Sequence, residues 1–206
     1  MKIVFATGNK NKMKEIREIL GSLGMDIISM AEAGVSDDIV EDGTTFEENS
    51  MIKARGVADA LKKADPELAG EAIVMADDSG LEVDFLNKEP GVYSARYMGK
   101  DTSYTEKNNN IISRLEGVPD EKRTARFVCA ISAVLPDGRD YCVRETMEGI
   151  IGYEIAGSNG FGYDPIFFLP EYGKTSAEIS PEEKNAISHR GKALRAMEKL
   201  LGDALK

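Results

Sequence analysis

Two lysines stand where the first predicted helix begins. In VFATGNKNKMKE (residues 4–15) an apolar run leads into Thr7-Gly8-Asn9, and Lys10, Asn11 and Lys12 follow. The first turn of a helix has unpaired N–H groups and the positive end of the helix dipole, so cations there disfavour an empty terminus. A strand–turn–helix junction with added lysines can instead bind an anion, usually phosphate. The stretch matches neither the Walker pattern G-x-x-x-x-G-K-[ST] nor the dinucleotide-binding pattern G-x-G-x-x-G. The alternative is a surface turn with two solvated lysines.

Two consecutive carboxylates, Asp77 and Asp78, follow the short apolar run at 72–76. Strand ends open onto crevices in α/β sheets, and Mg²⁺ binds through one or two carboxylates together with substrate phosphates. Asp-Asp-Ser-Gly is also ordinary turn chemistry. The nearby acidic pair Glu41-Asp42 and the candidate anion site favour the magnesium interpretation.

A further lysine, Lys53, falls within the apolar arc of a predicted helix, between Phe46 and Val57 on the helical wheel. An unpaired buried ammonium is costly, so this side chain either extends to solvent or points into a cleft. The sequence leaves both possibilities open.

A glycine-rich stretch with aromatic residues, GSNGFGYDPIFF, occupies residues 157–168. Its glycines allow the backbone to approach a ligand closely, while Phe161 and Tyr163 offer aromatic faces. The alternative is a flexible loop anchored by Phe161. Downstream come Lys184, the only histidine, His189, and Arg190. A histidine beside an arginine is usually a surface feature.

Hydrophobic periodicity predicts the elements that would position these residues. Strands are predicted at 2–6, 26–30, 72–76, 81–85, on both sides of Pro136-Asp137-Gly138, and at 164–170. Helices are predicted from residue 10 to 23, at 44–63 and 102–117, and from Ser180 towards the C-terminus. The helix at 44–63 begins with overlapping capping boxes, Thr44 with Glu47 and Thr45 with Glu48. Early alternation followed by a late hairpin indicates a mixed α/β fold in one domain, 1–206.

Composition narrows the class of protein. With 206 residues, 42% of them hydrophobic, the chain can fill one core. The net charge of −10 makes nucleic acid a poor candidate partner. We find no signal segment and no apolar run of about 18 residues, so a cytoplasmic protein without membrane attachment is expected. The only cysteines, Cys129 and Cys142, exclude a disulfide framework and are expected to be core thiols.

The chain resembles a known family, the inosine/xanthosine triphosphate pyrophosphatases. The matching stretches occur in the family's order: TGNKNKMKE, EDGTTFEENSMIKA, ADDSGLEVD, PGVYSARYMG, ARFVCA, GFGYDPIFF and EEKNAISHRGKAL. Each is weak alone, but seven in order across nearly the whole chain are specific.

The resemblance implies an elongated mixed sheet flanked by helices, with two lobes around a central nucleotide-binding cleft, usually in a homodimer. It implies Mg²⁺-dependent hydrolysis of non-standard purine nucleoside triphosphates (ITP, dITP and XTP) to the monophosphate and pyrophosphate. Such an enzyme cleanses the nucleotide pool. The lysines that disfavour an empty helix terminus are then explained by an occupied one.

The resemblance also assigns residues. Catalytic roles fall to Asp78, as the proposed base, and to Lys53, as a phosphate cation. Mg²⁺ would be bound by Glu41 and Asp78. Substrate would be bound by Thr7, Gly8, Asn9, Lys10, Asn11, Lys12 and Ser79, and its nucleoside by Phe161, Gly162, Tyr163, Asp164, Lys184, His189 and Arg190. The chain departs from the family pattern at Asn11 and Asn159, where glycine is common, and at Ser50, where alanine is common.

Two other functions remain to be tested. A related pyrophosphatase of the septum-inhibitor-like type would prefer pyrimidine triphosphates, but the intact GFGYDPIFF and SHR stretches favour purines. A nucleotide-binding sensor without turnover would not need Glu41, Asp77, Asp78 and Lys53, which together suit a water-activating metal site.

Overall fold

The computed structural model describes residues 2–21, 24–36 and 39–205. The chain forms two units. Unit 1 comprises Met1–Asp78, Cys129–Glu145 and Arg190–Lys206, and unit 2 comprises Ser79–Val128 and Thr146–His189. Among the described residues, no helix has the length and apolar character needed to cross a membrane.

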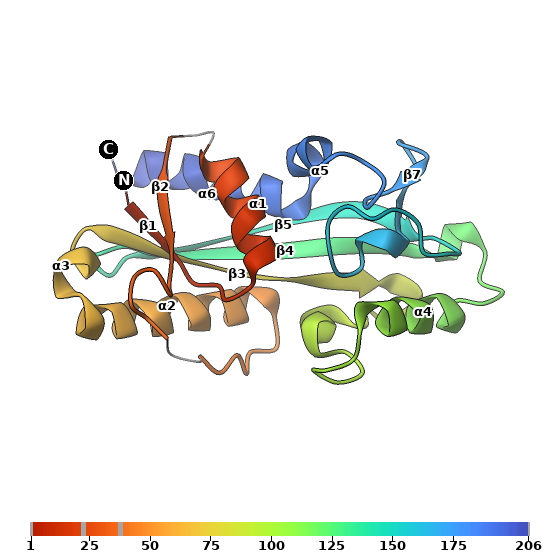
Figure 1. The fold of residues 1–206 in the computed structure, drawn as a ribbon, viewed down its shortest axis with the longest axis horizontal. Coiled ribbons are helices and arrows are strands. Elements are labelled where there is room, and N and C mark those ends of the chain that lie inside the picture. Colours follow the sequence, from red (N-terminus) through yellow and green to blue (C-terminus); the bar gives the residue numbers. More distant parts are fainter. Residues whose placement is uncertain (1, 22–23, 37–38, 206) are drawn as a thin grey trace. The chain divides into compact units, whose positions relative to one another are not determined.

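Helices and strands are combined in a mixed α/β fold, as predicted (Figure 1). The strands are β1 (Lys2–Phe5), β2 (Asp26–Ser29), β3 (Ala72–Val83), β4 (Thr124–Val134), β5 (Asp140–Ile151), β6 (Phe167–Leu169) and β7 (Lys174–Thr175). The helices are α1 (Lys10–Gly21), α2 (Phe46–Ala64), α3 (Pro66–Ala69), α4 (Tyr104–Arg114), α5 (Pro181–Ile187) and α6 (His189–Ala204). The strands are hydrogen-bonded in the order β2-β1-β3-β4-β5-β6-β7.

Unit 1 has a helix layer on each face of its strands. β1 pairs in parallel with both β2 and β3. Figure 1 shows α1 and α6 on one face and α2 on the other. Side chains alternate between the faces of a strand. Ile73 and Met75 therefore join the core under α1 and α6, while Val74 and Ala76 join the core against α2.

Two strand predictions differ from the structure. The strand expected at 164–170 is confined to β6, since Asp164–Ile166 form a 3-10 helix that includes Pro165. Separate strands at 72–76 and 81–85 were expected, with a turn at Asp77–Gly80, but β3 is continuous from Ala72 to Val83. Asp-Asp-Ser-Gly is typical of turns only as a local sequence, and pairing with neighbouring strands overrides that preference. Asp77 and Asp78 therefore lie within a strand.

Three helices begin with the same local arrangement, the capping box. At α2, α4 and α5 the N-cap residues Thr45, Ser103 and Ser180 each accept a hydrogen bond from the backbone of a glutamate three residues on, and that glutamate bonds back. Thr44 donates to Glu48 Oε2 from its backbone N–H at 2.7 Å and from its hydroxyl at 2.9 Å, in place of the alternative box with Glu47.

Unit 2 has a core of its own, which includes residues from α4, the hairpin strands and the segment around β6. Arg123 is buried beside this core and donates hydrogen bonds to the carbonyl oxygens of Leu115, Ile151 and Gly152, each at 2.7 Å. These three bonds join separate segments of the unit.

Two finer features differ from expectation. Cys129 is buried as predicted, but Cys142 is exposed, so the prediction of two core thiols is wrong for the second. The C-terminal helical region breaks at Ser188, which has extended backbone angles. His189 and Arg190 consequently open a new helix, α6.

Candidate active site

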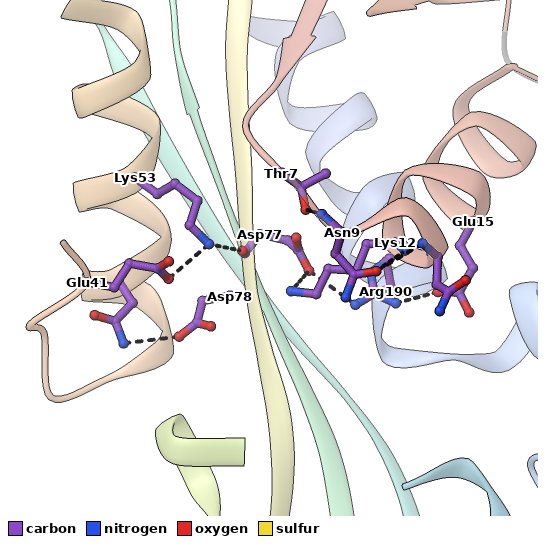
Figure 2. A network of polar contacts seen from close by, with 11 residues as sticks. Thr7, Asn9, Lys12, Glu15, Glu41, Lys53, Asp77, Asp78 and Arg190 are labelled. Carbon is purple, nitrogen blue, oxygen red and sulfur yellow. Dashed lines mark hydrogen bonds and ion pairs between the residues drawn. The ribbon is translucent and has the colours of Figure 1, made fainter. Parts of the chain in front are cut away.

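Asp77 and Asp78 point to opposite faces of β3. Figure 2 shows the Asp77 side chain beside Lys12 and Arg190, and the Asp78 side chain on the side of Glu41 and Lys53. This follows from the alternation of side chains along a strand. Two neighbouring carboxylates therefore have separate environments.

Asp77 is fully buried and paired with cations. Its Oδ2 lies 3.0 Å from Lys12 Nζ and 3.2 Å from the Arg190 guanidinium, which also pairs with Glu15. Burial by itself raises the pKa of the Asp77 carboxyl, but Lys12, Arg190 and Lys53 outweigh that effect and hold the pKa below its ordinary value. Asp77 is thus a fixed negative charge.

Asp78 has the opposite electrostatic character. Its Oδ2 accepts a hydrogen bond of 3.2 Å from Asn49 Nδ2. Burial raises the pKa of its carboxyl from 3.8 to about 6, against the effects of Lys12, Lys53 and Asn49, and Glu41 raises it further. An aspartate with a pKa near 6 is a better proton acceptor at neutral pH than an ordinary one.

Glu41 and Lys53 form an ion pair next to Asp78. The Lys53 ammonium lies 2.9 Å from Glu41 Oε2 and 3.3 Å from the carbonyl oxygen of Asp77. The side chain is largely buried, with 17% exposed. The sequence left open whether Lys53 extends to solvent or points inward. In the structure its ammonium is directed at the Glu41 carboxylate and the Asp77 carbonyl oxygen.

Asn49 connects Asp78 on β3 to the segment before α2 that carries Glu41. Its Oδ1 accepts from the backbone N–H of Gly43 at 2.9 Å, while its Nδ2 donates to Asp78. A Cβ at Gly43 would come within 2.8 Å of Asn49 Oδ1, so the close approach requires glycine. Asn49 therefore holds the segment that carries Glu41 next to Asp78.

The turn before α1 differs in part from the predicted anion site. The Asn9 side chain accepts from the backbone N–H groups of Asn11 and Lys12, at 2.9 and 3.2 Å, and so caps the helix. These two N–H groups were expected to be exposed. Gly8 and Lys10 are exposed, whereas Thr7 is buried and accepts from Asn9 N at 3.1 Å.

The residues fit a magnesium ion that is bound partly by the protein and partly by the phosphates of a substrate. Within the described chain, no group of three or more His, Cys, Asp or Glu side chains could hold a metal. Mg²⁺, however, needs only one or two carboxylates when phosphates and waters complete its octahedron. Asp78 and Glu41 supply two hard oxygen donors from different segments. Burial, with a smaller contribution from Glu41, raises the pKa of Asp78 although Lys12 and Lys53 lower it, so a bound cation would stabilise this carboxylate.

A second cluster, the loop cluster, lies in unit 2 and consists of Phe161, Asp164, Ser176 and Lys184. Asp164 is buried and accepts from Lys184 Nζ at 2.7 Å, from Ser176 Oγ at 2.8 Å and from the Phe161 backbone at 2.8 Å. The Lys184 ammonium also lies 5.2 Å from the centroid of the Phe161 ring. The Asp164–Lys184 ion pair thus fixes the backbone on which Phe161 is presented.

Other predicted residues occupy defined places. His189 is buried in unit 2 and stacks on Phe127, with ring centroids 4.9 Å apart. Tyr163 is buried and donates from its hydroxyl to the carbonyl of Ser94 at 2.7 Å. Ser79 is partly buried and follows Asp78 on β3.

Of the predicted phosphate and metal residues, the structure brings four together in unit 1: Lys12, Lys53, Glu41 and Asp78. Arg190, which the resemblance assigns to the nucleoside, pairs there with Asp77 and Glu15. Sequence reasoning missed the roles of Asn49 and Glu15. The position of Asn49 at the edge of an apolar helix face was a usable signal, whereas a lone Glu15 on a helix surface was not.

The architecture and the group formed by Lys12, Glu41, Lys53, Asp77 and Asp78 define a general class: α/β proteins with lysines beside acidic residues suited to a divalent cation. The pattern of the Ham1 family matches residues 3–200. The chain belongs to the Ham1 family.

Relatives support this over the full length. The chain is 46% identical over 206 residues to the dITP/XTP pyrophosphatase of Clostridium perfringens, covering all of this chain and 99% of the relative. It is 48% identical over 199 residues to the enzyme of the same name from Desulforamulus reducens, and the match covers 96% of this chain and 94% of the relative. The Ham1 protein structure from Staphylococcus aureus superposes with a TM-score of 0.84 at 38% identity, covering 99% and 100%. The resemblance and the prediction of an enzyme are confirmed.

Proposed function

We propose that the protein hydrolyses dITP, ITP and XTP to the nucleoside monophosphate and pyrophosphate, with Mg²⁺ as cofactor. The observation that carries the proposal is the pair of differently tuned aspartates on β3. Asp77 is a permanent anion that organises cations, and Asp78 has a pKa of about 6 beside a second carboxylate, Glu41. Full-length similarity to proteins named dITP/XTP pyrophosphatase supports the choice of reaction.

The proposed chemistry is electrostatic. Lys12 and Lys53 neutralise negative charge on the triphosphate as pyrophosphate leaves. The Asp78 carboxylate orients the attacking water and accepts its proton at a carboxylate oxygen. Glu41 and Asp78, together with the substrate phosphates, would hold Mg²⁺, and the bound ion would supply Lewis-acid polarisation of the phosphoryl group. Asn49 keeps the two carboxylates in register.

Base recognition is assigned to the unit 2 residues and Arg190. Phe161 offers a stacking face, and donors near His189 and Arg190 suit the 6-oxo group of a purine. Donors left unpaired against a 6-amino group would disfavour ATP. We also propose that the chain is a single cytoplasmic domain, as its sequence led us to expect, and, on the family resemblance alone, that it acts as a homodimer.

The direct test is pyrophosphate release with Mg²⁺, comparing kcat/KM for dITP, ITP, XTP, ATP, GTP and UTP. Preference for dITP, ITP and XTP supports the proposal. Equal rates, or faster rates with UTP, would contradict the proposed selection of purines but would leave the phosphate and metal assignments unaffected. Absence of release with retained nucleotide binding would point to a sensor.

A further inference from the structure

One buried side chain of α4 contacts the glycine-rich stretch of unit 2 directly. Asn108 is 2% exposed, and its Nδ2 donates a hydrogen bond of 3.1 Å to the carbonyl oxygen of Gly162. Its Oδ1 is also buried and has no hydrogen-bond partner in the described part of the chain. Exchanging the two amide atoms would place an oxygen against the Gly162 carbonyl, so the hydrogen bond fixes the orientation of the amide.

An unpaired buried acceptor lowers stability. A leucine of similar size would avoid that penalty, so packing alone does not explain an asparagine at this position. What the asparagine adds is a donor for one backbone carbonyl. That carbonyl lies between Phe161 and Tyr163, in the segment that presents the proposed stacking face.

Gly162 is a point where the segment needs support. Its φ is +69°, a conformation that glycine adopts freely and that does not restrain the chain by itself. Asp164 and Lys184 hold the segment from one direction. Asn108 holds it from α4, where Tyr104 also packs edge-to-face on Tyr163 at 5.4 Å.

We propose that Asn108 is a positioning residue for recognition of the purine base. Its hydrogen bond to Gly162 holds the backbone so that Phe161 is presented in one orientation. This inference rests on the proposed function, since it assigns a role within that same site. Asn108 acts on substrate only through the segment at 160–164.

The chain offers a matched control on the same helix. Asn109 is the next residue, has the same side chain and is exposed. The experiment compares Asn108→Leu and Asn108→Ala with Asn109→Leu and Asn109→Ala in the full-length protein. Two readouts are used: hydrogen exchange of the backbone at 158–166, with α2 as internal reference, and KM and kcat for dITP and dATP.

The expected result is local. In both Asn108 variants exchange at 158–166 becomes faster while α2 is unchanged. KM for dITP rises about five- to tenfold, the effect of losing one hydrogen bond, with kcat within about twofold. The preference for dITP over dATP falls, and the Asn109 variants behave as wild type.

Other outcomes overturn the proposal. Unchanged exchange at 158–166 would show that Asn108 does not restrain the segment. Faster exchange throughout, including α2, or equal losses with dITP and dATP, would assign Asn108 a purely structural role. If the wild-type protein releases no pyrophosphate from either nucleotide, the proposed function fails, and with it the role in base recognition. The exchange data would then still decide whether Asn108 holds the segment.

Discussion

Replacing Asp78 with asparagine is expected to stabilise the metal-free protein while it abolishes hydrolysis. Burial raises the pKa of this carboxyl from 3.8 to about 6, so the folded state disfavours its charged form. A shift of this size corresponds to about 3 kcal/mol of folding free energy once the group is ionised in both states. Asparagine keeps the shape and an acceptor for Asn49 but carries no charge.

The pH dependence has a definite sign. Well below pH 3.8 the carboxyl is protonated in folded and unfolded protein alike, and Asp78 contributes no difference. Between 3.8 and about 6 the unfolded chain loses the proton that the folded protein retains, so this group's contribution to stability falls as pH rises. Above about 6 the full penalty is present.

The assay is urea unfolding of wild type and Asp78→Asn in EDTA, at several pH values on either side of that window. The stability difference is expected to be small at low pH and to reach its maximum at neutral pH. Added Mg²⁺ should stabilise wild type more than the variant. Exposed Asp101→Asn serves as the control and should show no such pattern. A variant that is less stable than wild type at neutral pH without metal would refute the reasoning.

Three further substitutions test other parts of the two clusters. Asn49→Leu removes the link to Asp78 and is expected to lower Mg²⁺ affinity about 10- to 100-fold, measured by magnesium titration of activity and of thermal stability. Lys184→Met leaves Asp164 buried without its cation and should lower the free energy of unfolding by about 3–5 kcal/mol. The double variant with Asp164→Asn should recover part of that loss, and no recovery would argue against the ion pair. Gly160→Ala should reduce stability, because its Cβ would lie 2.2 Å from Asp164 Oδ2 and the backbone φ is +73°; an unchanged urea midpoint would contradict this.

Features set by local sequence could be predicted well. The starts of α2 and α5 follow from Thr45 and Ser180, because a capping box involves residues only three apart. The family resemblance likewise depends on short stretches read in order. The mixed α/β class follows from the alternation of such segments.

Features set by pairing between distant residues could not. Whether Asp77 and Asp78 lie in a turn or in a strand depends on neighbouring strands, and only the continuous strand separates them onto two faces. The capping of α1 by Asn9 was missed for a different reason. The Asn9 side chain can accept hydrogen bonds from the first N–H groups of α1, or those N–H groups can stay available to a ligand, and the sequence does not distinguish the two. The contact between Asn49 and Asp78 spans 29 residues and has no local signal.

The three capping boxes have a consequence for how sequence variants of this protein should be interpreted. The residue directly behind each box glutamate is buried and polar: Asn49 in α2, Lys107 in α4 and Lys184 in α5. Helix ends fray first, and each cap limits that fraying at a modest cost of about 1 kcal/mol when it is lost. Substitution of exposed Thr45 or Ser103, or of partly exposed Ser180, should therefore increase the mobility of the buried side chain one turn further along the helix. Such changes at the surface should have only a modest effect on the free energy of unfolding but a larger one on activity wherever the buried side chain belongs to the proposed site, as Asn49 and Lys184 do.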